Sequence, residues 1–213
     1  MSEATHLIQG RAAAIRIENL DTDQIMPKQF LRGIDKSGLA QGLLYDLRFD
    51  PAGVPRPDFV LNQPRYQGAN ILLCGSNFGC GSSREHAVWG LQQYGIQAVI
   101  APSFGEIFYS NAMNNQLMLV MLPAQQVHAL MEEAEREGSP VLIDVDQRRV
   151  KSKGLDVDFT VSDRHRQMFL ERLDVIGLTL RQRAAIAAFA ERHWRQHPWY
   201  QNVASQTRQR LRA

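Results

Sequence analysis

Two adjacent serines and an arginine stand behind a group of glycines, and no other part of the sequence has such clear chemical potential. Positions 74–86 read CGSNFGCGSSREH and contain Gly75, Gly79, Gly81, Ser82, Ser83 and Arg84. Glycines let the backbone approach a ligand closely, and a guanidinium can bind a carboxylate through two parallel hydrogen bonds. The stretch therefore indicates a site for an anion, and for a carboxylate in particular.

Other interpretations of the glycine-rich stretch explain less of it. Its spacing matches neither the dinucleotide pattern G-x-G-x-x-G nor a phosphate loop ending in Gly-Lys-Ser/Thr. Ser82 and Glu85 could form a capping box at the start of a helix. A cap needs one hydroxyl and no arginine, so it leaves Ser83 and Arg84 unexplained. The carboxylate site is the favoured prediction.

The flanking sequence predicts a parallel sheet that would position this loop. The apolar run 69–74 indicates a buried strand, and a helix is expected from about Ser83 to Tyr94, ended by Gly95. Strands at 96–101 and 117–122, with a helix over about 104–114 between them, complete a parallel crossover. Open α/β sheets bind ligands at such strand-to-helix junctions, where the first helical amides are free to donate to an anion.

The remaining elements predict an α/β fold that mixes parallel and antiparallel strands. We expect a strand at 12–17, a turn-rich excursion over 33–57, and a helix after Pro123 to about Glu137. Strands at 141–145, 149–151 and 157–161 would form a meander, and a final helix would span about 179–195. The expected division is a domain at 1–178 and a C-terminal helix with a basic tail at 179–213.

Composition excludes several classes of protein. The chain has 213 residues and 44% hydrophobic content, enough for one core, but no apolar run long enough to span a membrane. No secretory signal is recognisable at the N-terminus, so the cytoplasm is expected. Positions 181–213 contain seven arginines and one acid. This basic tail could bind an acidic partner, but a solvated helix face and a frayed end are favoured, and no nucleic-acid-binding signature accompanies it.

Longer runs of sequence identify a family. The stretch GCGSSREHA at 79–87 closely resembles the signature loop of the mobile swivel domain of aconitase-superfamily enzymes. The runs DTDQIMPKQFL at 21–31, GIDKSGL at 33–39 and IAPSF at 100–104 are similar to those of bacterial isopropylmalate dehydratase small subunits. The resemblance implies a swivelling β/β/α domain of a hydro-lyase that is active only with a large subunit. It would interconvert 2-isopropylmalate and 3-isopropylmalate by dehydration and rehydration in leucine biosynthesis.

The same resemblance assigns roles within the loop. Ser82 would be the catalytic base, acting as an alkoxide, while Gly81 and Ser83 would contribute to substrate contacts and Arg84 would bind a carboxylate of a small dicarboxylate substrate. A serine hydroxyl is a poor base near neutral pH. Amides, a helix N-terminus and a guanidinium beside it would stabilise the negative charge that the role requires.

The family places its 4Fe-4S cluster in the separate large subunit. Such a cluster normally takes three or four cysteine thiolates, and this chain has only Cys74 and Cys80. We therefore expect no metal ligand and no cofactor in this chain, and its expected partner is a large subunit that binds the cluster.

Three further polar residues have a structural and a functional interpretation. Asp21 and Asp23 could be paired acid-base carboxylates, but an Asp-Thr-Asp turn commonly bonds to its own backbone. The structural role is favoured. His86 is more typical of a structural hydrogen-bonding residue than of a ligand. All three remain secondary candidates.

Substrate identity depends on less specific sequence. By resemblance, Phe30, Leu31 and Ile34 are expected to line the pocket for the isopropyl group. Where bacterial small subunits read close to Asn-Gly-Leu-Leu-Pro, this chain has NQLML at 115–119. The departure leaves open a related hydro-lyase acting on methylmalate, citramalate or dimethylmalate. A stand-alone carboxylate-binding regulatory module is the alternative from another class.

Overall fold

The computed structural model describes residues 6–31 and 37–212. These form two compact units, one ending at Asp174 and the other beginning at Val175. The boundary expected after residue 178 stays a prediction. No helix among the described residues is long and apolar enough to cross a bilayer.

The first unit is built on a seven-stranded sheet with the order β4-β3-β2-β1-β5-β6-β7. Its strands are β1 (Leu7–Ile15), β2 (Ile71–Cys74), β3 (Ala98–Ala101), β4 (Met118–Met121), β5 (Pro140–Asp144), β6 (Arg149–Lys151) and β7 (Asp156–Asp158). Strands β1 to β4 are parallel to one another, whereas β5, β6 and β7 continue from β1 as an antiparallel meander. The predicted mixture of parallel and antiparallel strands is confirmed.

Strand β1 belongs to both halves of the sheet, and its burial follows from this. Residues 12–15 pair with β2 in the parallel half and are buried, whereas residues 7–11 pair with β5 and are exposed or half-buried. Parallel strands are covered on both faces and therefore read as continuous apolar runs. Every residue of β2 and β3 is buried in this way.

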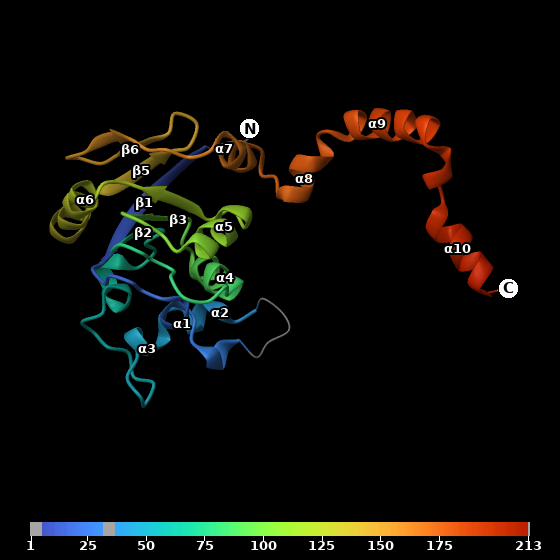
Figure 1. Ribbon diagram of the computed structural model, residues 1–213. Coiled ribbons are helices and arrows are strands. Elements are labelled where there is room, and N and C mark those ends of the chain that lie inside the picture. The colour runs from blue at the N-terminus through green and yellow to red at the C-terminus, as the bar shows by residue number, and fades with distance from the viewer. Residues whose placement is uncertain (1–5, 32–36, 213) are drawn as a thin grey trace. The chain divides into compact units, whose positions relative to one another are not determined.

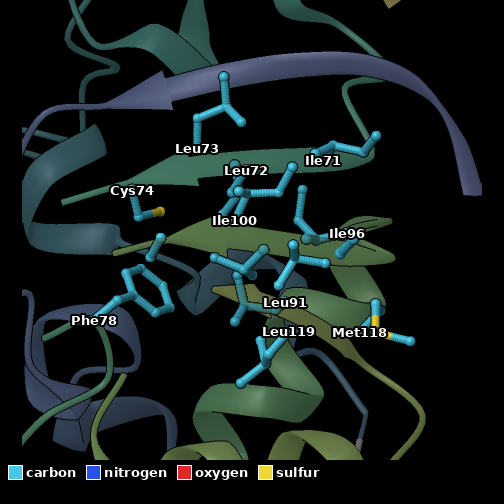
Figure 2. Packing of buried hydrophobic residues seen from close by; sticks show 14 of the residues in the cluster. Ile71, Leu72, Leu73, Cys74, Phe78, Leu91, Ile96, Ile100, Met118 and Leu119 are labelled. Atoms are coloured by element: carbon cyan, nitrogen blue, oxygen red, sulfur yellow. The ribbon is translucent and has the colours of Figure 1, made fainter. Parts of the chain in front are cut away.

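Helices cover both faces of the parallel strands. Helices α4 (Glu85–Tyr94) and α5 (Glu106–Asn114) connect β2, β3 and β4, and lie on one side, while α6 (Ala124–Glu137) lies on the other (Figure 1). Figure 2 shows Leu91 of α4 among the apolar side chains of β2 and β3, with Phe78 beside Cys74 at the end of β2. Helix α7 (Asp163–Glu171) follows the meander. The core therefore holds the end of β2 rigidly, directly before the glycine-rich loop.

The described part of the segment between β1 and β2 contains several short helices between its turns. It contains α1 (Thr22–Ile25), η1 (Lys28–Phe30), α2 (Leu39–Gly42), α3 (Tyr45–Arg48), η2 (Val60–Asn62) and η3 (Pro64–Tyr66). Leu39, Leu43 and Leu44 are buried in the core, which explains why this glycine- and proline-rich segment folds. The backbone N–H of Leu39 donates to the side-chain oxygen of Gln93, at 2.9 Å, and so attaches α2 to α4.

The C-terminal unit also differs from the prediction. The helix expected over about 179–195 corresponds to α9 (Arg183–Gln196), a separate short helix α8 (Val175–Leu180) precedes it, and the expected frayed end contains η4 (Pro198–Tyr200) and α10 (Val203–Arg212). None of the residues in these helices is buried. The predicted apolar face of α9 is open, because Ile186 is 48% exposed and Phe189 is 56% exposed.

Gln116 lies between α5 and β4. Its φ is 65°, in the left-handed region that favours glycine. Its side-chain amide donates to the backbone carbonyls of Met168 and Leu173, at 3.3 and 2.6 Å. Leu119 pairs with Val99 in the regular ladder between β3 and β4. The positive φ strains the backbone of Gln116, and the hydrogen bonds from its side chain to the end of α7 compensate for that strain.

Replacing Gln116 with alanine is expected to lower the free energy of unfolding by about 1–2 kcal/mol, because the hydrogen bonds to α7 are lost while the positive φ remains. Gln116→Gly should destabilise less, because glycine relieves a left-handed strain of about 1–2 kcal/mol. Denaturant unfolding of the three proteins tests this order. An alanine variant as stable as the glycine variant would contradict it.

Candidate functional site

The loops that follow β1, β2 and β3 meet at the carboxyl edge of the parallel strands. The backbone N–H of Gly79 donates to the carbonyl of Leu20 at 2.7 Å, which joins the second loop to the first. On its other side, Phe78 donates to the carbonyl of Ser103 at 3.2 Å and accepts from the N–H of Gly105 at 2.9 Å. The glycine-rich loop is therefore held between two neighbours at the edge where open α/β sheets bind ligands.

Glycine is required where the second and third loops cross. Gly79 has a φ of 75°, and a Cβ there would lie 2.3 Å from Cγ of Phe108. A Cβ on Gly105 would lie 2.6 Å from the carbonyl oxygen of Gly79. Contacts this short cannot be relieved by a rotamer change when the neighbour is backbone. Gly79 and Gly105 are therefore fixed by packing within the chain, and the predicted close approach of the loop to a ligand stays a prediction.

The side chain of Phe78 attaches the loop to the core. Its side chain is fully buried and makes edge contacts with Phe104 and Phe108, at ring-centroid distances of 6.4 and 5.3 Å. Aromatic pairs in this arrangement add to the stabilisation from burial alone. The loop therefore has one side fixed in the core, while the residues after Gly81 are free to face solvent.

Ser82 and Ser83 are exposed at the tip of the loop, directly after Gly81, whose φ is 92°. The carbonyl of Ser83 accepts from the side-chain amide of Asn111 on α5, at 3.5 Å. Within the described part of the chain, neither the Ser82 hydroxyl nor the Ser83 hydroxyl has a hydrogen-bond partner. Both hydroxyls are therefore available to a ligand.

Arg84 lies beside this serine pair and forms an ion pair with Asp23 of α1. The Arg84 side chain is only 20% exposed, whereas that of Asp23 is 48% exposed. Arg84 also precedes the helix, because α4 begins at Glu85 and Arg84 is its extended N-cap residue. The helix expected from about Ser83 begins two residues later, so Arg84 precedes its first turn.

The two aspartates of the first loop have different partners. Asp21 is the N-cap of α1, where its carboxylate accepts from the N–H of Gln24 at 2.7 Å and the Gln24 side chain accepts from Asp21 N–H at 3.0 Å. Asp23 instead points to Arg84. The backbone-bonding interpretation therefore describes Asp21, while Asp23 belongs to the site.

The capping box considered for Ser82 and Glu85 is not formed. No side chain caps α4, and the Glu85 carboxylate accepts from the side-chain amide of Asn115, at 2.5 Å. The Asn115 side chain also accepts from the indole N–H of Trp89 at 3.1 Å. His86 is half-buried with its ring against that of Trp89, at a centroid distance of 4.8 Å. Asn115 thus fixes the start of α4 against the end of α5.

Sequence reasoning missed Thr22, Asn111 and Asn115. Each of the three contacts a segment that is distant in the sequence, which local patterns do not reveal. Only Thr22 could have been suspected from the sequence, because it stands between the two aspartates of a run that resembles the family. Thr22 is 1% exposed, and its N–H donates to the carbonyl of Cys80 at 2.9 Å. It lies directly under the loop.

Two of the three residues expected to set substrate choice, Phe30 and Leu31, pack on the core. Phe30 is half-buried, with its ring 5.0 Å from that of Tyr45, and a Cβ on Gly42 would overlap it. Leu31 is also half-buried against the core. Ile34 lies outside the described residues. The pocket-lining role of these three residues stays a prediction.

The two cysteines do not fit an iron-sulfur cluster in this chain. Cys74 is fully buried in β2, and burial raises the pKa of its thiol well above the usual range. The thiol of Cys80 donates to the carbonyl of Asn19 at 3.4 Å. A cluster needs three or four thiolates, and no group of three or more His, Cys, Asp and Glu residues suited to a metal occurs in the described part of the chain.

Comparison with known proteins identifies the family. The aconitase C-terminal domain family matches residues 4–125, and the family of the C-terminal domain of 3-isopropylmalate dehydratase small subunits matches residues 176–203. The 3-isopropylmalate dehydratase small subunit 1 of Chromobacterium violaceum is 63% identical over 205 residues, covering 96% of this chain and 97% of the relative. This chain belongs to the 3-isopropylmalate dehydratase small-subunit family. The resemblance carried by positions 79–87 is confirmed.

Other members of the 3-isopropylmalate dehydratase small-subunit family agree. The small subunit of Phenylobacterium zucineum is 44% identical over 202 residues, covering 94% of this chain and all of that protein. The crystal structure of a 3-isopropylmalate dehydratase from Methanocaldococcus jannaschii has a TM-score of 0.61 at 29% identity, and covers 85% of this chain and 98% of its own. The archaeal member thus has the same α/β fold and is almost wholly matched, whereas part of this chain has no counterpart in it.

Proposed function

We propose that this chain is the small subunit of a 3-isopropylmalate dehydratase, a hydro-lyase that interconverts 2-isopropylmalate and 3-isopropylmalate together with a large subunit. The observation that carries the proposal is the exposed Ser82 next to Arg84, on the loop at the carboxyl edge of the sheet. The reaction would belong to leucine biosynthesis in the cytoplasm.

The reaction requires a base and a carboxylate-binding group. Dehydration removes a proton from a carbon beside a carboxylate and a hydroxyl from the neighbouring carbon, and rehydration returns them with their positions exchanged. Ser82, as an alkoxide, would take the proton and return it. Arg84 would hold a substrate carboxylate through two parallel hydrogen bonds, so that the reacting carbon stays within reach of Ser82.

The surroundings of Ser82 support its role as a base. The loop ends at the N-terminus of α4, where helix amides carry partial positive charge, and the guanidinium of Arg84, which is shared with Asp23, adds positive charge beside them. Both favour an oxyanion on Ser82 over its protonated form. Gly81 and Ser83 flank this position and would offer backbone and hydroxyl contacts to the substrate.

Asp23 gives Arg84 a partner when no substrate is present. The Asp23 carboxylate is paired with the guanidinium of Arg84, which is the group that would bind the substrate carboxylate. A substrate must therefore compete with Asp23 or share Arg84 with it. The exposed side of this ion pair is where we place the substrate carboxylate.

We assign the 4Fe-4S cluster to the large subunit, where it would supply a Lewis acid for departure of the hydroxyl. The thiol chemistry of this chain supports the assignment, because Cys74 is buried and Cys80 bonds to backbone. The substrate's alkyl group would face Phe30, Leu31 and Ile34. The departure at Gln116 gives no support to a different substrate, because its side chain contacts α7.

The proposal predicts activity on isopropylmalate only after assembly. The chain, co-expressed with its large subunit, should interconvert the two isopropylmalates, and methylmalate, citramalate and dimethylmalate should react more slowly. One missing methylene costs about 1–3 kcal/mol of transition-state binding, or roughly 10- to 200-fold in kcat/KM. The assay follows formation of the alkene intermediate for each substrate. An assembled complex that prefers another malate would reject the isopropylmalate assignment, and tight carboxylate binding by the chain alone would favour a regulatory module.

A further inference from the structure

We propose that Thr22 is a positioning residue that holds Ser82 in its working orientation. The inference rests on the proposed function, because it gives a role to a residue that acts on the proposed base. Thr22 is the first residue of α1, far from Ser82 in the sequence and directly beneath it in the fold.

One hydroxyl holds both backbone groups of Ser82. The Oγ1 atom of Thr22 accepts from the N–H of Ser82 at 3.1 Å and donates to the carbonyl of the same residue at 3.1 Å. A group that binds the N–H and the carbonyl of one residue restrains the φ and ψ angles between them. Thr22 therefore sets the direction in which the Ser82 side chain leaves the backbone.

Thr22 is buried and Ser82 is exposed, as expected if Thr22 is the supporting residue and Ser82 the reactive one. Thr22 is 1% exposed, whereas Ser82 is exposed. Buried hydroxyls are normally hydrogen-bonded, and both bonds of this hydroxyl are made to Ser82. Thr22 does not face solvent and so acts through Ser82, without touching the substrate.

The support itself is rigid. The capping box between Asp21 and Gln24 fixes the start of α1, and the N–H of Thr22 donates to the carbonyl of Cys80 at 2.9 Å. A Cβ on Gly81 would lie 3.6 Å from Oγ1 of Thr22, so the loop passes close over the threonine. The loop is thus attached to α1 on both sides of Gly81.

Ser82 needs this restraint because of its neighbour. Gly81 has a φ of 92° and, lacking a Cβ, opposes rotation of the loop less than any other residue would. Without the threonine hydroxyl, water can satisfy the exposed backbone of Ser82, and the side chain is free to take other directions. A base displaced by 1 Å can cost up to about 10² in rate, which makes the orientation of Ser82 worth fixing.

The test compares Thr22→Val and Thr22→Ser in the complex with the large subunit, assayed on isopropylmalate. Valine has nearly the shape of threonine but no hydroxyl, while serine keeps the hydroxyl and loses only a methyl group. We expect Thr22→Val to lower kcat about tenfold with KM unchanged, and Thr22→Ser to restore most of the loss. Thermal unfolding and co-purification of the complex establish that each variant folds and assembles.

The outcomes separate this inference from the proposed function. A Thr22→Val complex with kcat within twofold of the original would overturn it, as would equal losses in both variants, which would indicate packing of the methyl group. A rise in KM with unchanged kcat would also overturn it. Thr22→Ala gives the same comparison if the valine variant fails to assemble.

Ser82→Ala is assayed in parallel. If that variant is active, the proposed base is wrong. An inactive Ser82→Ala beside an active Thr22→Val rejects the role of Thr22 alone.

Discussion

Replacing Ser82 with alanine is expected to lower kcat of the assembled enzyme by about 10³-fold, within the range of 10² to 10⁴ that a positioned base contributes. Ser82 is exposed at the tip of the loop, so loss of its hydroxyl removes no packing. The variant should therefore bind the large subunit and substrate as before. Steady-state kinetics on isopropylmalate, with gel filtration of the complex, measures both quantities.

Ser110→Ala is a matched control for this change, because Ser110 is an exposed serine on α5 of the same unit. It should leave kcat unchanged. Full activity in Ser82→Ala would end the assignment of the alkoxide. A loss of activity caused by failed assembly would show instead that Ser82 supports the interface.

Replacing Arg84 with lysine is expected to raise KM about 30- to 100-fold while kcat falls much less. Lysine keeps the positive charge but cannot form two parallel hydrogen bonds to a carboxylate. A hydrogen bond to a charged group contributes roughly 1.5–3 kcal/mol, and each 1.4 kcal/mol corresponds to a tenfold change in binding. The stability of the chain should change by under about 1 kcal/mol, because lysine keeps a positive charge beside Asp23.

Arg149→Lys provides the comparison for this substitution. Arg149 lies on β6, in the antiparallel half of the sheet, and forms a half-exposed ion pair with Asp156 at 2.5 Å. The same change of residue there should leave KM unaltered. If Arg84→Lys has an unchanged KM and a large fall in kcat, then Arg84 acts on the transition state and not on substrate binding.

The sequence predicted those elements of the fold whose pattern is local. Fully buried strands such as β2 and β3 read as continuous apolar runs, and the left-handed Gly95 marked the end of α4. For the segment expected to be turn-rich, 33–57, the glycines and prolines gave no indication that Leu43 and Leu44 are buried. Nothing in the local pattern said that these leucines would find a core to pack against.

The hypothesis about the chemistry of the site also came from residue types. A serine pair and an arginine after three glycines indicated an anion site, and the two cysteines were too few for a cluster. The start of α4 could not be predicted, because the spacing of Ser82 and Glu85 fits a capping box that the structure does not form. The alternative partner of Glu85 is Asn115, which lies 30 residues further along the chain.

By itself, the sequence determined which groups are available for chemistry and which family the chain resembles, because both depend on residues that are neighbours in the chain. The tertiary structure decided how those groups are held. The ion pair of Arg84 with Asp23 and the hydrogen bonds of Thr22 to Ser82 join loops about 60 residues apart, and they exist because parallel strands end at one edge of the sheet. Which side chains meet at that edge depends on strand order and register, and neither is encoded in the spacing of a motif.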